Sequence, residues 1–302
     1  MLFMDRVFVI IVTYKGMTWY ERCFNSLRHS TIPVTAVVVD NASQDGTVEF
    51  IQREVPEFVL IESAENLGFG KANNIGIRYA LDHGADYVFL LNQDAWIDPD
   101  ALEILVSIHK KHPEYGLLSP MHLNVDRTGL VMKFFCRQPN NGELITDLYL
   151  NQLSDVYNTK YIHAAAWLLP KQTLQTIGGF DPIFHHYAED DDYLNRLRYH
   201  RMKIGVCPAA RIVHDHHNRI QSPEAVRYRH RQTMLADYMD LNHPFHPGVY
   251  FRHDVWKIIR NLFRLNTKEN KELKDDLLFL LKNAKEITKH RKQNQKEGLT
   301  WL

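Results

Sequence analysis

Short apolar runs alternate with helical segments over the first ninety residues of the chain. The apolar runs are Arg6–Tyr14, Ala36–Val39, Phe58–Ser63 and Tyr87–Leu91. Runs of this kind, rich in β-branched residues, are typical of strands buried on both faces of a parallel sheet. The segments between them carry helical spacing or helix start signals, and they are Trp19–Ser30, Thr47–Glu54 and the later part of Glu65–Leu81. This βαβαβαβ order predicts an α/β fold with a mainly parallel sheet flanked by helices.

The alternation is less regular after Asp98. We expect further helices at Ala101–His112, at Lys171–Ile177 and from about Asp190. Short strands are expected at 115–120, Ala164–Leu169, 203–208 and 210–214. The polar, glycine-bearing stretch from about Asn124 to Lys160 predicts an irregular, hairpin-rich region that varies to suit a substrate.

From Pro223 onward the sequence becomes helical and basic. Helices are expected at Ala225–Asn242, Val255–Phe263 and Lys271–His290. Twelve Lys or Arg residues stand against seven Asp or Glu residues between His253 and Glu297. A basic helical segment of this kind has two interpretations. It is either a solvated tail that packs one apolar stripe against the domain, or a segment that contacts anionic lipid or a partner protein.

Composition narrows the class of protein. The 302 residues carry 36 basic and 36 acidic side chains, and this zero net charge gives no electrostatic footprint for nucleic acid. The three cysteines are far apart and form no CxxC pair, which argues against a disulfide framework and a zinc site. No apolar run approaches the roughly 20 residues that span a bilayer. We therefore expect a cytoplasmic protein that at most touches the inner face of the membrane.

The strand Tyr87–Leu91 ends abruptly at Asn92, and Asp94 follows two residues later. Ligands of open α/β sheets bind at the carboxyl ends of the strands. Amide and carboxylate oxygens are suitable ligands for a hard divalent cation. The alternative is a plain turn in which Asp94 caps the helix that begins near Pro99.

Two more stretches bring polar groups to a strand end or a helix start. Asp40 ends the second strand, where a carboxylate either accepts a hydrogen bond from the ring N–H of uracil or thymine, or caps the next helix. The loop NLGFGKANNIG, from Asn66 to Gly76, offers backbone N–H groups that suit a phosphate. The loop is neither a Walker loop nor a dinucleotide fingerprint, so it identifies no ligand by itself.

Four consecutive carboxylates, Glu189 to Asp192, begin a predicted helix. Four exceed what capping needs, so at least one is a candidate general base for a sugar hydroxyl. Asp192 and Arg196 are spaced i,i+4 and are expected to pair, which favours a structural role for Asp192. His214 ends a predicted strand and is either an ordinary strand-end residue or a further metal ligand.

Together these stretches resemble a family-2 glycosyltransferase of the GT-A fold, especially the bacterial rhamnosyltransferase-like and polysaccharide-assembly subgroup. The resemblance runs from about Val7 to His217. Its landmarks in chain order are IVTY, VVVDNASQDGT, ENLGFGKANNIG, LLNQDAW, GGFDPIFHHYAEDDDYLNRL and IVHDHH. The resemblance implies a GT-A (Rossmann-like) mixed sheet over residues 1–220, with a nucleotide-binding half to about 98 and an acceptor half from 99. Residues 221–302 form a helical, locally basic extension.

The resemblance also implies roles for single residues. The donor nucleotide and its sugar would contact Thr13, Tyr14, Asp40, Asn66, Gly68, Gly70, Asn73, Asn92 and Gln93. Asn92-Gln93-Asp94 stands at the family's DXD motif, with Asn92 in place of the first acid. Mg²⁺ or Mn²⁺ would bind Asp94 and His214.

The Glu189-Asp190 pair matches the family's Glu-Asp motif. The resemblance makes Asp190 the catalytic base, with Asp191 as the alternative and Glu189 beside it. After His214 the segment DHHNRIQSP departs from the Gly/Ser-rich loop that relatives often carry.

The implied activity is inverting, metal-dependent transfer of a sugar from a UDP- or dTDP-sugar to a glycan or lipid-linked acceptor, in bacterial surface polysaccharide assembly. One alternative is a nucleotidyltransferase, but TYKGMTWYERC is a poor match to the Gly-rich basic loop of that class. The other is a non-catalytic nucleotide-sugar or glycan-binding protein on the same fold, against which the acidic cluster argues.

Overall fold

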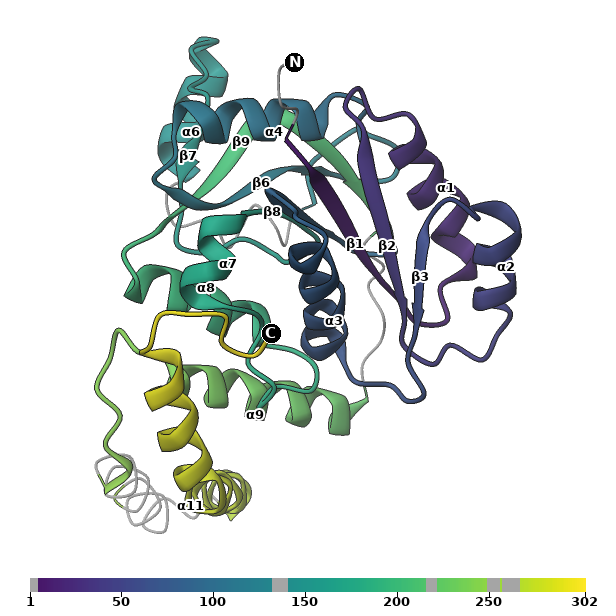
Figure 1. The fold of residues 1–302 in the computed structure, drawn as a ribbon. Coiled ribbons are helices and arrows are strands. Elements are labelled where there is room, and N and C mark those ends of the chain that lie inside the picture. The colour runs from purple at the N-terminus through teal and green to yellow at the C-terminus, as the bar shows by residue number, and fades with distance from the viewer. Residues whose placement is uncertain (1–4, 132–140, 216–221, 249–255, 257–266) are drawn as a thin grey trace.

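The computed structural model describes residues 5–131, 141–215, 222–248, 256 and 267–302 (Figure 1). The strands are β1 (Val7–Thr13), β2 (Val34–Asp40), β3 (Val59–Glu62), β4 (Tyr87–Leu91), β5 (Ala95–Ile97), β6 (Tyr115–Leu123), β7 (Tyr157–Asn158), β8 (Ala166–Pro170) and β9 (Lys203–His214). The helices are α1 (Met17–Arg28), α2 (Thr47–Glu54), α3 (Phe69–Asp82), α4 (Ala101–Lys111), α6 (Asn141–Leu150), α7 (Lys171–Ile177), α8 (Glu189–Tyr199), α9 (Pro223–Met239) and α11 (Thr267–Asn294).

One mixed sheet forms the centre of the fold, in the order β3-β2-β1-β4-β8-β6-β9-β5, with β7 beside β9. The first four strands in this order run parallel, and β8 is antiparallel to β4. The last residues of β1 and β2, Thr13 and Asp40, are paired in register. The carboxyl ends of the parallel strands therefore meet at one edge, where a ligand is expected.

Helices cover both faces of the sheet, and alternation along the strands divides the core in two. In β1, Val7, Val9 and Ile11 pack in the cluster beneath α1, α2 and α4. Phe8 and Ile10 point the other way, into the cluster with α3, α7 and α8. Period-2 alternation of apolar residues buries both faces and gives the three-layer arrangement seen in Figure 1.

The C-terminal helices pack on the α8 side. A third apolar cluster joins residues of α9 and α11 to the segment just before α8. After α11 the chain returns to the body of the fold, and its end lies beside α3 and α8 (Figure 1). Within the described residues, no helix is both long and apolar enough to cross a membrane. The expected helix Val255–Phe263 lies outside the described residues, except for Trp256.

Two expectations about elements were wrong, and one strand was not expected. The region 124–160 is not only hairpins, because it contains α6, whose Leu144 is buried in the core. The strands expected at 203–208 and 210–214 form one strand, β9. A register shift against β6 after Cys207 accommodates Pro208, which lacks the donor of a ladder hydrogen bond. The three-residue strand β5 had not been expected.

Candidate active site

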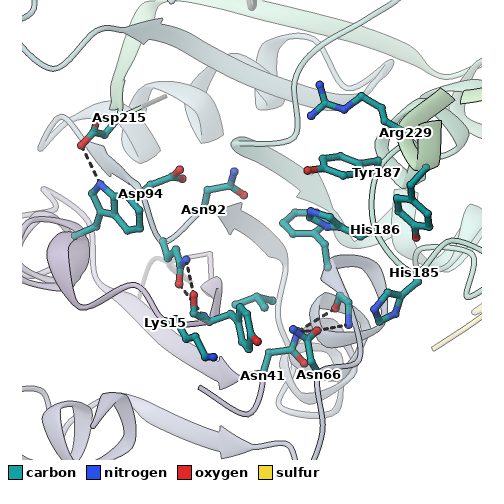
Figure 2. Close-up of a pocket in the computed structure, with 17 residues that line it drawn as sticks. Lys15, Asn41, Asn66, Asn92, Asp94, His185, His186, Tyr187, Asp215 and Arg229 are labelled. Atoms are coloured by element: carbon teal, nitrogen blue, oxygen red, sulfur yellow. Dashed lines mark hydrogen bonds between the residues drawn. The ribbon is translucent and has the colours of Figure 1, made fainter. Parts of the chain in front are cut away.

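A cavity of about 760 Å³ opens at the carboxyl ends of β1, β2 and β4 (Figure 2). Its walls come from these strand ends, from the start of α3, from the loop before α8 and from α9. The lining residues are Val12, Tyr14, Lys15, Trp19, Asn41, Asn66, Gly68, Phe69, Asn92, Gln93, Asp94, His185, His186, Tyr187, Asp215, Tyr228 and Arg229. The structure thus brings six of the predicted site residues to one surface: Tyr14, Asn66, Gly68, Asn92, Gln93 and Asp94.

Amide side chains form the wall between β2 and α3. Asn41 donates from Nδ2 to Asn66 Oδ1 at 3.0 Å, and its own Oδ1 accepts from the backbone N–H of Leu67 at 2.8 Å. Gly68 has a φ of +81°, and a Cβ at this position would come within 1.8 Å of the carbonyl oxygen of His185. Only glycine allows this approach, so Gly68 brings the α3 loop against the segment that precedes α8.

Four predicted residues lie beneath this wall instead of lining the cavity: Thr13, Asp40, Gly70 and Asn73. Asp40 is 3% exposed, and its carboxylate accepts hydrogen bonds from the Thr13 hydroxyl at 3.0 Å and from the backbone N–H of Ser43 at 3.1 Å. Asn73 is buried and donates to a carbonyl one helical turn earlier. Gly70 packs against the segment after α7. These residues support the loops that form the wall.

Gln93 bonds to the backbone at the end of β1. Its Oε1 accepts from the Tyr14 N–H at 2.8 Å, and its Nε2 donates to the Tyr14 carbonyl at 3.1 Å. The hydroxyl of Tyr20 donates to the same Oε1 at 3.3 Å. This amide therefore fixes the β1 and β4 ends to each other, while Asn92 beside it faces the cavity (Figure 2).

Asp94 and Asp215 form an acidic corner of the cavity. Pairing of β5 with β9 sets Ala95 opposite His214, and the Asp215 N–H donates to the Asp94 carbonyl at 2.8 Å. His214 is buried behind this corner, with Nε2 3.4 Å from Asp94 Oδ1. Burial alone would raise the pKa of Asp94, but the hydrogen bond and charge of His214 outweigh burial and lower it. An ionised carboxylate therefore faces the cavity.

This corner fits a divalent cation that is shared with a ligand. No group of three or more His, Cys, Asp or Glu residues in the described part of the chain could hold a metal ion. Mg²⁺ in nucleotide sites is commonly held by one or two carboxylates, the phosphates and water. Asp94 and Asp215 supply two such carboxylates, so these two residues could hold a divalent cation together with oxygen atoms of a ligand and water.

The wall opposite Asp94 was missed by sequence reasoning. It consists of the loop residues His185, His186 and Tyr187, together with Tyr228 and Arg229 of α9 (Figure 2). The Arg229 guanidinium lies 4.4 Å from the centroid of the Tyr187 ring, a cation–π contact. The sequence HHY before the acidic cluster could have indicated the loop. Nothing in the sequence of α9 distinguishes Arg229 from its neighbouring arginines.

The acidic cluster forms the first turn of α8, directly after the loop that lines the cavity. Asp190 and Asp191 are half-buried and are not part of the cavity's described lining. The Asp190 Oδ1 accepts from the N–H of Asp191 at 3.0 Å. Glu189 is buried, and burial, followed by the charge of Asp190, raises its pKa to about 8. The four acids therefore differ in environment.

Asp192 has the structural role that its spacing predicted. It is fully buried, and Oδ2 accepts from Arg196 Nε at 2.9 Å. Arg196 also donates to the carbonyls of Ile177 and Gly179 at 2.8 and 2.7 Å. The pair therefore joins α8 to the end of α7.

The known proteins whose sequences are similar to this chain are glycosyltransferases. Residues 8–176, more than half of the chain, match the family described as Glycosyl transferase family 2. The chain is 26% identical over 276 residues to the low-salt glycan biosynthesis hexosyltransferase Agl10 of Haloferax volcanii. This match covers 86% of this chain and 86% of that protein. It is 26% identical over 229 residues to N-acetylglucosaminyl-diphospho-decaprenol L-rhamnosyltransferase of Mycobacterium tuberculosis, covering 68% of this chain and 75% of that protein.

Among solved structures, Staphylococcus aureus TarS in complex with UDP has a similar fold. The TM-score is 0.53 at 17% sequence identity, covering 76% of this chain and 65% of that chain. The predicted GT-A fold is therefore confirmed. The chain belongs to glycosyltransferase family 2. It is therefore a glycosyltransferase, as its sequence predicted.

Proposed function

We propose that this enzyme transfers a hexosyl or rhamnosyl group, with inversion, from a UDP- or dTDP-sugar to a glycan or lipid-linked acceptor in surface polysaccharide assembly. The observation that carries the proposal is the cavity at the sheet edge, with the carboxylates of Asp94 and Asp215 on one side and Arg229 on the other. Opposite charges on two walls suit a diphosphate that arrives with a cation.

In this proposal the nucleotide binds at the β1–β2 end of the cavity. Tyr14 is 40% exposed and offers a ring face for the base, while Asn41 and Asn66 offer amide groups for the base and ribose. Thr13, Asp40, Gly70 and Asn73 support this end from beneath. The predicted contact of Asp40 with the base requires the base to reach a carboxylate that is 3% exposed and already accepts hydrogen bonds from Thr13 and Ser43.

The diphosphate lies near Asp94 and Asp215 in the proposed complex. Mg²⁺ or Mn²⁺, when bound there, neutralises charge on the leaving group. Asp94 and Asp215 would hold such an ion, and His214, which was predicted as a ligand, would instead hold Asp94 in place from behind. Arg229 lies on the opposite wall of the cavity and adds positive charge from α9.

The proposed base is Asp190, with Asp191 as the alternative. The acceptor hydroxyl attacks the anomeric carbon on the face opposite the diphosphate, and the bond from that carbon to the diphosphate oxygen breaks with its electron pair staying on the oxygen. The hydroxyl proton passes to the Asp190 carboxylate. Glu189 lies beside this base, and burial, followed by the charge of Asp190, raises its pKa to about 8, which favours its protonated form.

The acceptor and the membrane belong to this proposal as well. A lipid-linked acceptor is supported by the name of the mycobacterial relative, an L-rhamnosyltransferase of a diphospho-decaprenol substrate. The α11 helix exposes Leu278 and Leu281 among several lysines, which suits contact with an anionic membrane surface at the cytoplasmic face.

The test of the proposed function is nucleotide release from a panel of UDP- and dTDP-sugars by the purified protein. We expect slow donor hydrolysis that EDTA abolishes and that added Mn²⁺ or Mg²⁺ restores. Turnover that persists in excess chelator would contradict the metal role. Donor binding without any nucleotide release would instead favour the non-catalytic alternative.

A further inference from the structure

The loop between α7 and α8, Gly178 to Ala188, is tied to a distant helix. Asp181 in this loop is 1% exposed. Its Oδ1 lies 2.6 Å from His290 Nδ1, and its Oδ2 accepts from Asn294 Nδ2 at 2.7 Å. Both partners belong to the last turns of α11, 109 and 113 residues later in the chain. Because a buried carboxylate needs such partners, Asp181 and α11 hold each other in place.

The residues after α11 run back along the same loop. The N–H of Gly179 donates to the carbonyl of Thr300 at 2.8 Å. Gly178 has a φ of +73°, and a Cβ there would lie 1.9 Å from the Thr300 carbonyl oxygen. The two glycines, which the sequence presents only as a helix stop, therefore also make room for a C-terminal backbone segment.

Trp301 holds the two side chains that bind Asp181. Its indole N–H donates to Asn294 Oδ1 at 2.7 Å. Its ring stacks on His290 with centroids 4.7 Å apart and an interplanar angle of 16°. Trp301 thus orients His290 and Asn294 at once, in the way that outer partners orient the ligands of a site.

Apolar contacts fix the far end of the loop. Phe184 and Ala188 are buried in a cluster with Leu280 and Ile287 of α11 and with residues of α9. His185 to Tyr187, which line the cavity, lie between the buried residues Phe184 and Ala188. The acidic first turn of α8 follows directly after Ala188. Residues that come after position 230 therefore contact both ends of the loop, in addition to Asn74 and Arg196, which bond to the backbone of Phe180 and Gly179.

We propose that the segment from His290 to Leu302 is a positioning element for the catalytic base. His290, Asn294 and Trp301 are positioning residues, because none of them is part of the cavity's described lining and they act through Asp181. The inference rests on the proposed function for the role of Asp190. Its physical basis is that a displacement of about 1 Å in a reacting group costs on the order of 100-fold in rate.

The first test uses the full chain with His290→Ala or Asn294→Ala, at a temperature where circular dichroism shows each variant folded. We expect kcat for nucleotide release from UDP-glucose or dTDP-rhamnose to fall by about 10-fold or more, and the donor KM to rise by a smaller factor. The change in KM is expected to be the smaller one because the variants leave the β1–β4 side of the cavity intact, while His185 to Tyr187 line only the opposite wall. His290→Asn keeps an N–H donor near the place of Nδ1 and is expected to recover much of kcat.

Thr288→Ala is the matched control, since Thr288 is exposed on the same helix and bonds only within it. The second test is hydrogen exchange of the amides from 179 to 192. These amides are expected to exchange faster in His290→Ala and Asn294→Ala, and at the wild-type rate in Thr288→Ala.

Three results would overturn the positioning element. One is an unchanged kcat in both alanine variants. Another is a loss of activity that merely follows the unfolded fraction, and a third is exchange that stays at the wild-type rate. A wild-type protein that releases nucleotide from no donor refutes the proposed function instead, and the exchange rates then decide alone whether α11 holds the loop.

Discussion

Asp190 stands at the start of α8, half-buried, next to Glu189, whose pKa is raised by burial to about 8. We expect Asp190→Asn to lower the rate of sugar transfer by about 10²–10⁴-fold, the usual contribution of a general base. Binding of the nucleotide, measured by calorimetry, should not change, because Asp190 is outside the described cavity lining. Asp191→Asn is the comparison: a larger loss there would make Asp191 the base, and full activity in both variants would exclude both.

Glu189 should make the stability of the protein depend on pH. Its pKa rises from 4.5 to about 8 on folding, so the folded state binds more protons than the unfolded state between these values. The free energy of unfolding therefore falls as pH rises through this window, by up to about 1.4 kcal/mol per pH unit from this group. We expect Glu189→Gln to flatten that slope in urea unfolding measured between pH 5 and 8.

The control for this measurement is Glu49→Gln, because Glu49 is exposed on α2. It should leave the pH slope of the wild-type protein unchanged. An equally steep slope in Glu189→Gln would show that Glu189 is ionised in the folded protein at neutral pH.

At the scale of elements, the buried Asp192–Arg196 pair decides how α8 meets α7. Replacing Arg196 with Met leaves Asp192 buried without its charge partner and removes the bonds to the carbonyls of Ile177 and Gly179. We expect Arg196→Met to lower the free energy of unfolding by about 3–5 kcal/mol. Urea unfolding measures the loss.

A neighbouring arginine on the same helix provides the control. Arg198 is one-third exposed, and its ion pair with Asp240 spans 3.8 Å, so Arg198→Met should cost less than about 1 kcal/mol. Adding Asp192→Leu to Arg196→Met should recover part of the stability, since the unpaired carboxyl is then gone. Equal losses in the two single variants would contradict a special role for the buried pair.

Elements with strong local signals could be predicted from the sequence, and elements set by distant pairing could not. The bounds of α2, α7 and β4 agree with the expected ones because apolar periodicity and stop signals coincide there. By contrast, β5 has three residues and exists through its pairing with β9. That pairing brings Asp215 beside Asp94, which is why the second carboxylate of the acidic corner was missed.

The candidate site follows the same rule. Tyr14, Asn92 and Asp94 follow strand ends, and parallel strands bring their ends together, so sequence alone could place them. Arg229 and Tyr228 reach the cavity from α9, through packing between residues far apart in the chain. Packing between residues far apart in the chain cannot be predicted from a local sequence pattern.

At the scale of the whole molecule, the cavity should bind pyrimidine nucleotides together with a divalent cation. Selective binding to the folded state raises its stability by about 2.7 kcal/mol at a hundredfold excess over Kd, which is a shift of several degrees in Tm. We expect UDP or dTDP with Mn²⁺ to give such a shift in a thermal denaturation series, and ADP or GDP to give a smaller one. Equal shifts for purine nucleotides would contradict the assigned base recognition.

The bonds from α11 to Asp181 also bear on the order in which the molecule folds. The parallel strands β1 to β4 and their helices are complete within the first hundred residues, so the nucleotide side of the cavity can form its local contacts early in synthesis. Asp181 of the α7–α8 loop acquires its α11 partners only after another 109 to 113 residues have been made, and such long-range contacts form slowly. A growing chain is therefore expected to recognise its nucleotide before it can transfer a sugar, so that activity begins only once the last helix has docked.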